Sequence, residues 1–183
     1  CLIIAKNSGI KLPYVKYLKN ANFYNPHGIG IAYWKNKSNE VVIKKDFTNI
    51  NPFLKWFKKN ITKSDACVIH FRFATSGLID NGNRHPFPLT RSGEIIRREN
   101  FKCKMAVAHN GVVSQYSSYK VSNDKKRFSD TQLFIMDILQ DPLIKENLKN
   151  KTIKKLLENF VCGDKLAFLD AGGHIIKFGD FER

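Results

Sequence analysis

Apolar positions along the chain recur either in short runs or at helical spacing, which divides the sequence into strands and amphipathic helices. The runs LIIA, GIGIAYW, VVIKK, ACVIHFRFA and KMAVAHNG predict strands. The segments LPYVKYLKNA, NPFLKWFKKN, SDTQLFIMDILQ and IKKLLENF predict helices. Polar KNKSN between two strands and AGG within KLAFLDAGGHIIKFG predict hairpins. Strand pairs with helices grouped between them indicate an α+β layered sandwich, not a simple β-α-β repeat.

The residues at the helix starts predict where three of these helices begin. Pro13 is expected in the first turn of the first helix, where its missing N–H has no cost. Asn51 is expected to be the N-cap of the second helix, in front of Pro52. Ser129 and Asp130 are expected to open the helix in SDTQLFIMDILQ, which has the strongest helical pattern in the chain.

Length and composition predict one domain. The chain has 183 residues and is 43% hydrophobic, enough for one compact core and too short for two full domains. No apolar run approaches the roughly 18 to 20 residues that span a bilayer, and no leader precedes Cys1. The four cysteines lack paired spacing, so we expect no zinc site and no disulfide framework. No cofactor is expected. A soluble, cytoplasmic protein is expected.

The chain is strongly basic, with 31 Lys and Arg residues against 16 Asp and Glu residues and a formal net charge of +15. Such a charge attracts polyanions, so nucleic acid is a candidate partner. The lysines are, however, spread along the whole chain, and most fall on the polar side of a helix or at a strand end. This pattern is typical of a solvated surface and makes specific nucleic-acid binding the less favoured interpretation.

The first segment whose residues indicate a binding or catalytic role is HFRFATSG, residues 70–77. Arg72 lies among apolar residues, and burying a guanidinium requires a carboxylate or an oxygen-rich ligand. An internal salt bridge would satisfy it. Thr75 and Ser76 follow at once with Gly77, and these hydroxyls and open backbone suit recognition of a small polar molecule instead.

The second segment is AHNGVV, residues 108–113. Asn110 and Gly111 place a side-chain amide beside an unobstructed backbone N–H, which is the donor pair that an oxyanion hole requires. Asn-Gly is also the commonest tight-turn dipeptide. No polar alternation resumes in the following VVSQYSSY, which indicates an irregular or helical segment and not a returning strand.

The third segment is FSDTQLF, where Asp130 lies in the first turn of a helix. An acid at this position is often a capping group, but it can also receive a ligand's ammonium. His85 lies in NRHPFPL, a loop stiffened by proline. One guanidinium, one carboxylate, hydroxyls and a donor pair are the groups needed to hold a zwitterionic amino acid and polarise its carbonyl.

These segments together resemble the class II glutamine amidotransferases of the N-terminal nucleophile hydrolases. HFRFATSG resembles the family's H-T-R-W-A-T-x-G, AHNG its H-N-G, SDTQ its S-D-[ST]-E, NRHPF its N-x-H-P-F, and NPHGIGIAYW its N-P-D-G-x-G-I-A. The motifs follow the family's order from Cys1 to nearly the C-terminus. The resemblance implies that Cys1 stands at a mature N-terminus and attacks the side-chain amide of glutamine, with its own α-amine as base. A chain that simply begins at a cysteine is the weaker account.

The resemblance also implies roles for the other residues. Arg72 would bind the α-carboxylate of glutamine, and Thr75 and Ser76 would line the pocket. Asn110 and Gly111 would form the oxyanion hole. The two remaining roles are Asp130 on the α-ammonium and His85 in support of the site.

The chain departs from the family pattern at four positions. The departures are Phe71, Phe73, His27 and Gln132, where the family often has Thr, Trp, Asp and Glu. They remove no catalytic group and put the pocket shape in question.

The implied fold is the four-layer αββα sandwich, formed by residues 1–183 as one glutaminase domain. The implied partner is a separate ammonia-consuming synthase or transferase, to whose acidic surface the positive charge would be complementary. Two other functions remain open. One is a partner-independent hydrolase of γ-glutamyl compounds or small amides, and the other is an inactive basic module that binds nucleic acid or protein.

Overall fold

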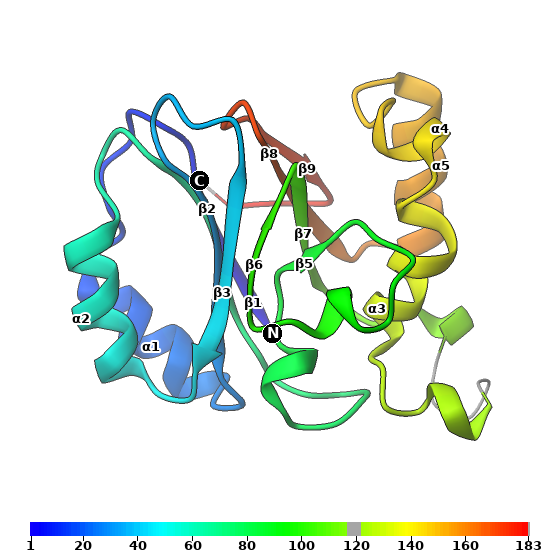
Figure 1. The fold of residues 1–183 in the computed structure, drawn as a ribbon, viewed down its shortest axis with the longest axis horizontal. Helices are drawn as coiled ribbons and strands as arrows, with labels where there is room; N and C mark the ends of the chain where they lie inside the picture. The colour runs from blue at the N-terminus through cyan, green and yellow to red at the C-terminus, as the bar shows by residue number, and fades with distance from the viewer. Residues whose placement is uncertain (117–121, 183) are drawn as a thin grey trace.

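The computed structural model describes residues 1–116 and 122–182. Within these residues, two antiparallel sheets form the centre of the molecule (Figure 1). One sheet has the order β1-β4-β2-β3-β6 and the other β5-β7-β8-β9. The strands are β1 (Leu2–Lys6), β2 (Ile29–Trp34), β3 (Val41–Phe47), β4 (Ala66–Phe71), β5 (Phe87–Pro88), β6 (Asn100–Cys103), β7 (Met105–Asn110), β8 (Lys165–Asp170) and β9 (Ile175–Phe178).

The helices lie on the outer faces of the two sheets. They are α1 (Val15–Tyr24), α2 (Ile50–Asn60), α3 (Asp130–Phe134), which continues as a π-helical turn (Ile135–Leu139), α4 (Pro142–Lys145) and α5 (Lys151–Val161). Short 3-10 turns cover Asn81–Asn83, Ile95–Arg97, Ser114–Tyr116 and Asn123–Lys125. None of the helices in the described ranges combines the length and apolarity needed to cross a bilayer.

Three apolar clusters hold these elements together. Helices α1 and α2 pack on the five-stranded sheet through residues such as Leu18, Phe57 and Ile69. The facing sides of the sheets meet through small residues, among them Val68, Ala108 and Ala167. Helices α3 and α5 cover the four-stranded sheet through Phe134, Leu157 and Phe168. The arrangement in Figure 1 confirms the α+β class expected from the sequence.

Buried and partly exposed residues alternate along some strands and not along others, depending on which faces of the sheet are covered. All six residues of β4 are buried, because helices cover one face of its sheet and the second sheet covers the other. In β3 every second residue is buried, including Lys45. The Lys45 ammonium donates to the carbonyls of Gly82 and Ile96 at 3.1 and 3.0 Å, and burial holds its pKa well below the usual value.

Two predicted helix starts are wrong, and one is confirmed. Helix α1 begins at Val15 and not around Pro13, because Tyr14 still has an extended backbone. Asn49, not Asn51, precedes α2, which places Pro52 inside the first turn, where no N–H is required. Ser129 caps α3 as expected.

The segment VVSQYSSY was expected to be irregular or helical. Its residues Ser114–Tyr116 form a 3-10 turn, as that expectation allows. Residues 117–121 lie outside the described part of the chain.

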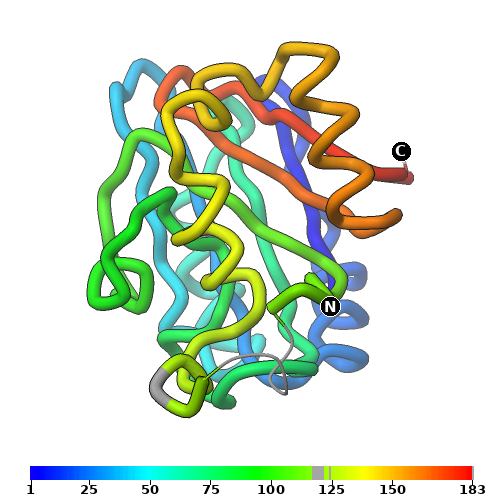
Figure 2. The backbone as a smooth tube through the Cα atoms, turned by 90° about the vertical axis from the view of Figure 1, so that its right-hand side faces the viewer, coloured from blue at the N-terminus to red at the C-terminus, as the bar shows by residue number. Residues whose placement is uncertain are grey.

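The strand pairing brings distant loops to one end of the sheets. Strand β1 runs antiparallel to β4 with Leu2 opposite Phe71, so Cys1 lies beside the residues that follow β4. Figure 2 shows the N-terminus close to the chain that leaves β7, in agreement with the shared cavity of Cys1 and Gly111. Three loops that the sequence singled out therefore meet at the N-terminus.

Candidate active site

A small cavity of about 20 Å³ lies at this end of the sheets, with space for a single water molecule. Its walls come from five separate parts of the chain. The lining residues are Cys1, Arg72, Phe73, Ala74, Thr75, Ser76, His85, His109, Gly111, Ser129, Asp130 and Thr131. Seven of the eight predicted site residues are among them. The eighth, Asn110, does not line the cavity but lies between two residues that do, His109 and Gly111.

Cys1 is held by the backbone of Phe73. The Cys1 Sγ donates to the Phe73 carbonyl at 3.1 Å and accepts from the Phe73 N–H at 3.2 Å. A protonated thiol fits both contacts, because only S–H can donate to the carbonyl while the sulfur accepts from the N–H. Partial burial lowers the pKa of the Cys1 α-amine, since the ammonium loses contact with water. The amine is therefore neutral at lower pH than an ordinary α-amine.

The Arg72 guanidinium meets backbone oxygens and not a carboxylate. It donates to the carbonyls of Leu78 and Ser76 at 2.8 and 3.0 Å. In the described part of the chain it forms no ion pair, so the internal salt bridge that the sequence left open is not present. Burial lowers the Arg72 pKa to about 10, which still leaves the group cationic at neutral pH. Thr75 lines the cavity from an exposed position in the same loop.

Asp130 joins the first turn of α3 to two other loops. Its Oδ1 accepts from the Ser76 hydroxyl at 2.7 Å, and its Oδ2 accepts from the Val113 N–H at 2.6 Å. The Asp130 N–H in turn donates to Ser76 Oγ at 3.2 Å. The helix cap is made by Ser129, whose hydroxyl accepts from Gln132 N, so capping does not account for the Asp130 carboxylate.

His85 contacts the end of β7. Its Nδ1 accepts from the His109 N–H at 3.1 Å, and its ring stacks on His70 with 4.2 Å between centroids. Burial, the largest cause, holds the pKa of His85 well below its usual value and lowers that of His70 to about 3. Both imidazoles are therefore neutral. The Nε2–H of His70 donates to the His109 carbonyl at 3.1 Å, since a carbonyl can only accept.

His27, one of the departures from the family pattern, holds the loop that follows β4. Its Nδ1 accepts from the Ala74 N–H at 2.8 Å, and its ring lies 5.2 Å from that of Phe73. A carboxylate could accept the same hydrogen bond, so the substitution preserves this contact and adds a ring contact.

Sequence reasoning missed the residues that fix the far side of the cavity. His109 bonds to the Thr131 hydroxyl through Nδ1 at 2.8 Å and to Asp164 through Nε2 at 3.1 Å. Both His109 and Thr131 lie inside quoted motifs, but the sequence pattern favours only a structural role for His109 and assigns none to Thr131. Asp164 stood in no motif, and nothing local in its sequence signalled it.

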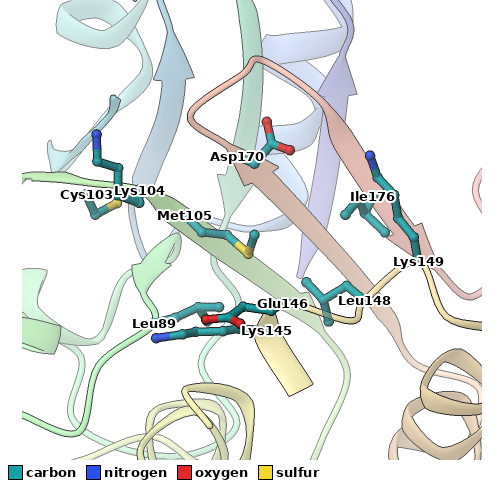
Figure 3. A pocket seen from close by; sticks show the side chains of 10 residues that line it. All are labelled: Leu89, Cys103, Lys104, Met105, Lys145, Glu146, Leu148, Lys149, Asp170 and Ile176. Carbon is teal, nitrogen blue, oxygen red and sulfur yellow. The ribbon is translucent and has the colours of Figure 1, made fainter. Parts of the chain in front are cut away.

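A larger hollow of about 510 Å³ lies elsewhere, beside the Met105 end of β7 (Figure 3). None of the predicted site residues lines it. Lys104, Lys145 and Lys149 belong to its wall, and their amino groups do not meet at one point. The hollow therefore lacks the convergent polar groups that mark a binding site.

Comparison with known families gives one match. The family model described as class-II glutamine amidotransferases matches residues 10–160, more than half of the chain. The matched range contains Arg72, His85, Asn110 and Asp130, and it leaves Cys1 outside. A search of curated proteins found no match.

Proposed function

The chain belongs to the class II glutamine amidotransferases, and on this basis we propose that it hydrolyses glutamine with Cys1 as the nucleophile and passes the ammonia to a synthase or transferase partner. The observation that carries the proposal is the meeting of Cys1, Arg72 and Asp130 in one cavity with Gly111. A thiol, a cation, an anion and a backbone donor are the groups that this reaction needs.

The amino-acid end of glutamine is held by Arg72 and Asp130. Arg72 binds the α-carboxylate in place of the two backbone carbonyls that now accept its hydrogen bonds. Asp130 binds the α-ammonium, and Thr75 and Ser76 line the site. Because the cavity has space for one water molecule, the loop that carries Phe73 to Leu78 must shift when glutamine enters.

The first half-reaction forms a thioester. The Cys1 thiol gives its proton to the α-amine, and the sulfur attacks the side-chain carbon of glutamine. The carbonyl oxygen becomes an oxyanion, which accepts hydrogen bonds from the Gly111 N–H and the Asn110 side chain. The C–N bond then breaks, the amine returns its proton to the leaving nitrogen, and ammonia departs.

The second half-reaction releases glutamate. A water molecule gives a proton to the α-amine and attacks the thioester, and the same donors stabilise the second oxyanion. The C–S bond breaks and the thiol is restored. This scheme requires Cys1 to be the first residue of the mature enzyme, and the lowered pKa of its α-amine supports the amine as base near neutral pH.

The proposal extends to the layer arrangement of the fold, the number of domains and the partner. Helices on the outer faces of two stacked sheets support the four-layer αββα sandwich of the N-terminal nucleophile hydrolases. Three clusters shared between consecutive layers support residues 1–183 as one glutaminase domain. An amidotransferase needs an acceptor for the ammonia, which supports a synthase or transferase partner.

Covalent labelling tests the assignment of the nucleophile. A glutamine analogue with a diazoketone in place of the side-chain amide should alkylate Cys1, as located by peptide mass mapping. Cys162 is an exposed free thiol, so Cys162→Ser is the matched control and should label as fast as the wild type. Labelling of Cys162 instead of Cys1, or labelling that free glutamine does not slow, would reject the proposal.

A further inference from the structure

Asp164 lies in the turn between α5 and β8, away from every motif that pointed to the site. Its N–H donates to the Val161 carbonyl at 3.1 Å, which fixes its backbone. Its side chain is 22% exposed and extends to the turn that follows β7. A carboxylate from one loop therefore contacts the turn that carries Asn110 and Gly111.

The carboxylate contacts the chain on both sides of these two residues. Asp164 Oδ2 accepts from the Val112 N–H at 2.9 Å and bonds to His109 Nε2 at 3.1 Å. A Cβ placed on Gly111 would lie 1.8 Å from Asp164 Cγ, so the carboxyl group packs directly on the glycine. The turn is held by two hydrogen bonds and one close contact from the same side chain.

The same carboxylate also sets the direction of a hydrogen-bond chain. A carboxylate only accepts, so His109 Nε2 carries a proton and donates to Asp164. In the neutral imidazole, Nδ1 then accepts from the Thr131 hydroxyl at 2.8 Å. Thr131 follows Asp130 in the first turn of α3. The chain Asp164–His109–Thr131 thus connects the turn after β7 to the turn that presents Asp130.

We propose that Asp164 is a positioning residue that holds Asn110 and Gly111 as the oxyanion hole and ties them to the α3 turn. The inference rests on the proposed function, since it assigns Asp164 to that same site. Donors stabilise an oxyanion only when they are fixed before the charge develops. A side chain that fixes the turn therefore acts on the chemical step more than on glutamine binding.

Two substitutions at residue 164 separate the effect of its hydrogen bonds from the effect of its charge. Asp164→Ala should lower kcat for glutamine hydrolysis about 10-fold or more and change KM by less than about threefold, because the donors act in the transition state. Asp164→Asn should stay within about threefold of wild type, since one amide oxygen can accept both hydrogen bonds. Asp180→Ala removes an exposed aspartate and is the matched control. Equal kinetic losses in the Ala and Asn variants, or a loss confined to KM, would overturn the proposal.

A double-mutant cycle tests whether Asp164 acts through the turn. In an Asn110→Ala background, Asp164→Ala should cost a smaller fold-change in kcat than it costs in the wild type, because the hole is already damaged. Equal fold-changes in both backgrounds would contradict a positioning role.

Amide hydrogen exchange tests the same contacts without glutamine. The peptide covering residues 109–113 should exchange faster in Asp164→Ala and at the wild-type rate in Asp164→Asn and Asp180→Ala. Unchanged exchange in Asp164→Ala would overturn the proposal whatever the kinetics. If exchange is faster in Asp164→Ala but the wild-type protein does not hydrolyse glutamine, Asp164 holds the turn and the proposed function is rejected.

Discussion

The Cys1 sulfur and the Phe73 backbone hold each other, with Sγ donating to the Phe73 carbonyl and accepting from its N–H. Residue 73 lies in the loop that also contains Ser76, whose hydroxyl contacts Asp130. One short loop therefore joins the nucleophile to the groups proposed to bind the amino-acid end of glutamine. A change in this loop should alter both binding and chemistry.

Arg72→Lys tests the carboxylate site. Lysine keeps the charge but lacks the planar fork that pairs with a carboxylate, so KM for glutamine should rise about 10-fold or more with a smaller change in kcat. Steady-state kinetics on purified variants checks this. Arg98→Lys, at a half-exposed arginine paired with Glu94, is the control and should match wild type. An unchanged KM in Arg72→Lys would exclude Arg72 from binding the carboxylate.

Asp130→Asn tests the ammonium site. The amide oxygen can still accept from the Val113 N–H, and the amide NH2 can donate to Ser76 Oγ, but the side chain no longer offers a negative charge. KM should therefore rise about 10-fold or more while the fold is kept. Asp141→Asn makes the same chemical change at the N-cap of α4, where Asn caps equally well, and should leave KM unchanged. Equal KM values for glutamine in Asp130→Asn and Asp141→Asn would contradict the assignment of Asp130 to the ammonium.

Local patterns predicted the strands other than β5 and β6, the Ser129 cap and most of the residues that line the cavity, because each depends on neighbouring residues. The start of α1 was misplaced because Pro13 is compatible with a first turn without requiring one. Asp164 was missed for a different reason. It meets His109 across 55 positions, and only the packing of the α5–β8 turn against the end of β7 brings them together. The Arg72 contacts likewise depend on how the loop after β4 folds back.

Gln132→Glu tests the departure from the family's glutamate. Gln132 is fully buried, its Oε1 accepts from Ser129 N–H at 3.0 Å, and its Nε2 donates to the Gly82 carbonyl at 3.0 Å. Glutamate cannot donate when ionised and would set a buried charge against that carbonyl, so the free energy of unfolding should fall by about 3 kcal/mol. Denaturant unfolding measures the loss. Exposed Gln115→Glu is the control, and equal stability of the two variants would contradict this account.

The buried histidines predict acid sensitivity of the fold. His70 has a pKa of about 3 when folded and an ordinary value near 6.5 when unfolded, so only the unfolded chain gains protons just below pH 6.5. Its contribution to the free energy of unfolding is complete above pH 6.5 and is lost as the pH falls. The loss reaches about 2 kcal/mol by pH 5. His85, also held well below its usual pKa, adds to this loss.

Urea unfolding between pH 8 and pH 5 measures this effect. Asp65 and Asp80 have pKa values lowered by hydrogen bonds and do not titrate in that range. The exposed His174→Asn variant should keep the wild-type pH dependence. A free energy of unfolding that stays constant from pH 8 to pH 5 would show that the histidines are not held neutral in the fold.

The measurement that tests the central claim most directly is glutamate and ammonia release from glutamine by wild type, Cys1→Ala and Cys162→Ala. Intact-mass analysis must first confirm that each chain begins at residue 1. The account predicts equal amounts of glutamate and ammonia from wild type and Cys162→Ala, and none from Cys1→Ala. Release that persists in Cys1→Ala, or its absence from wild type with a verified free Cys1, would contradict the assignment of Cys1 as the glutaminase nucleophile.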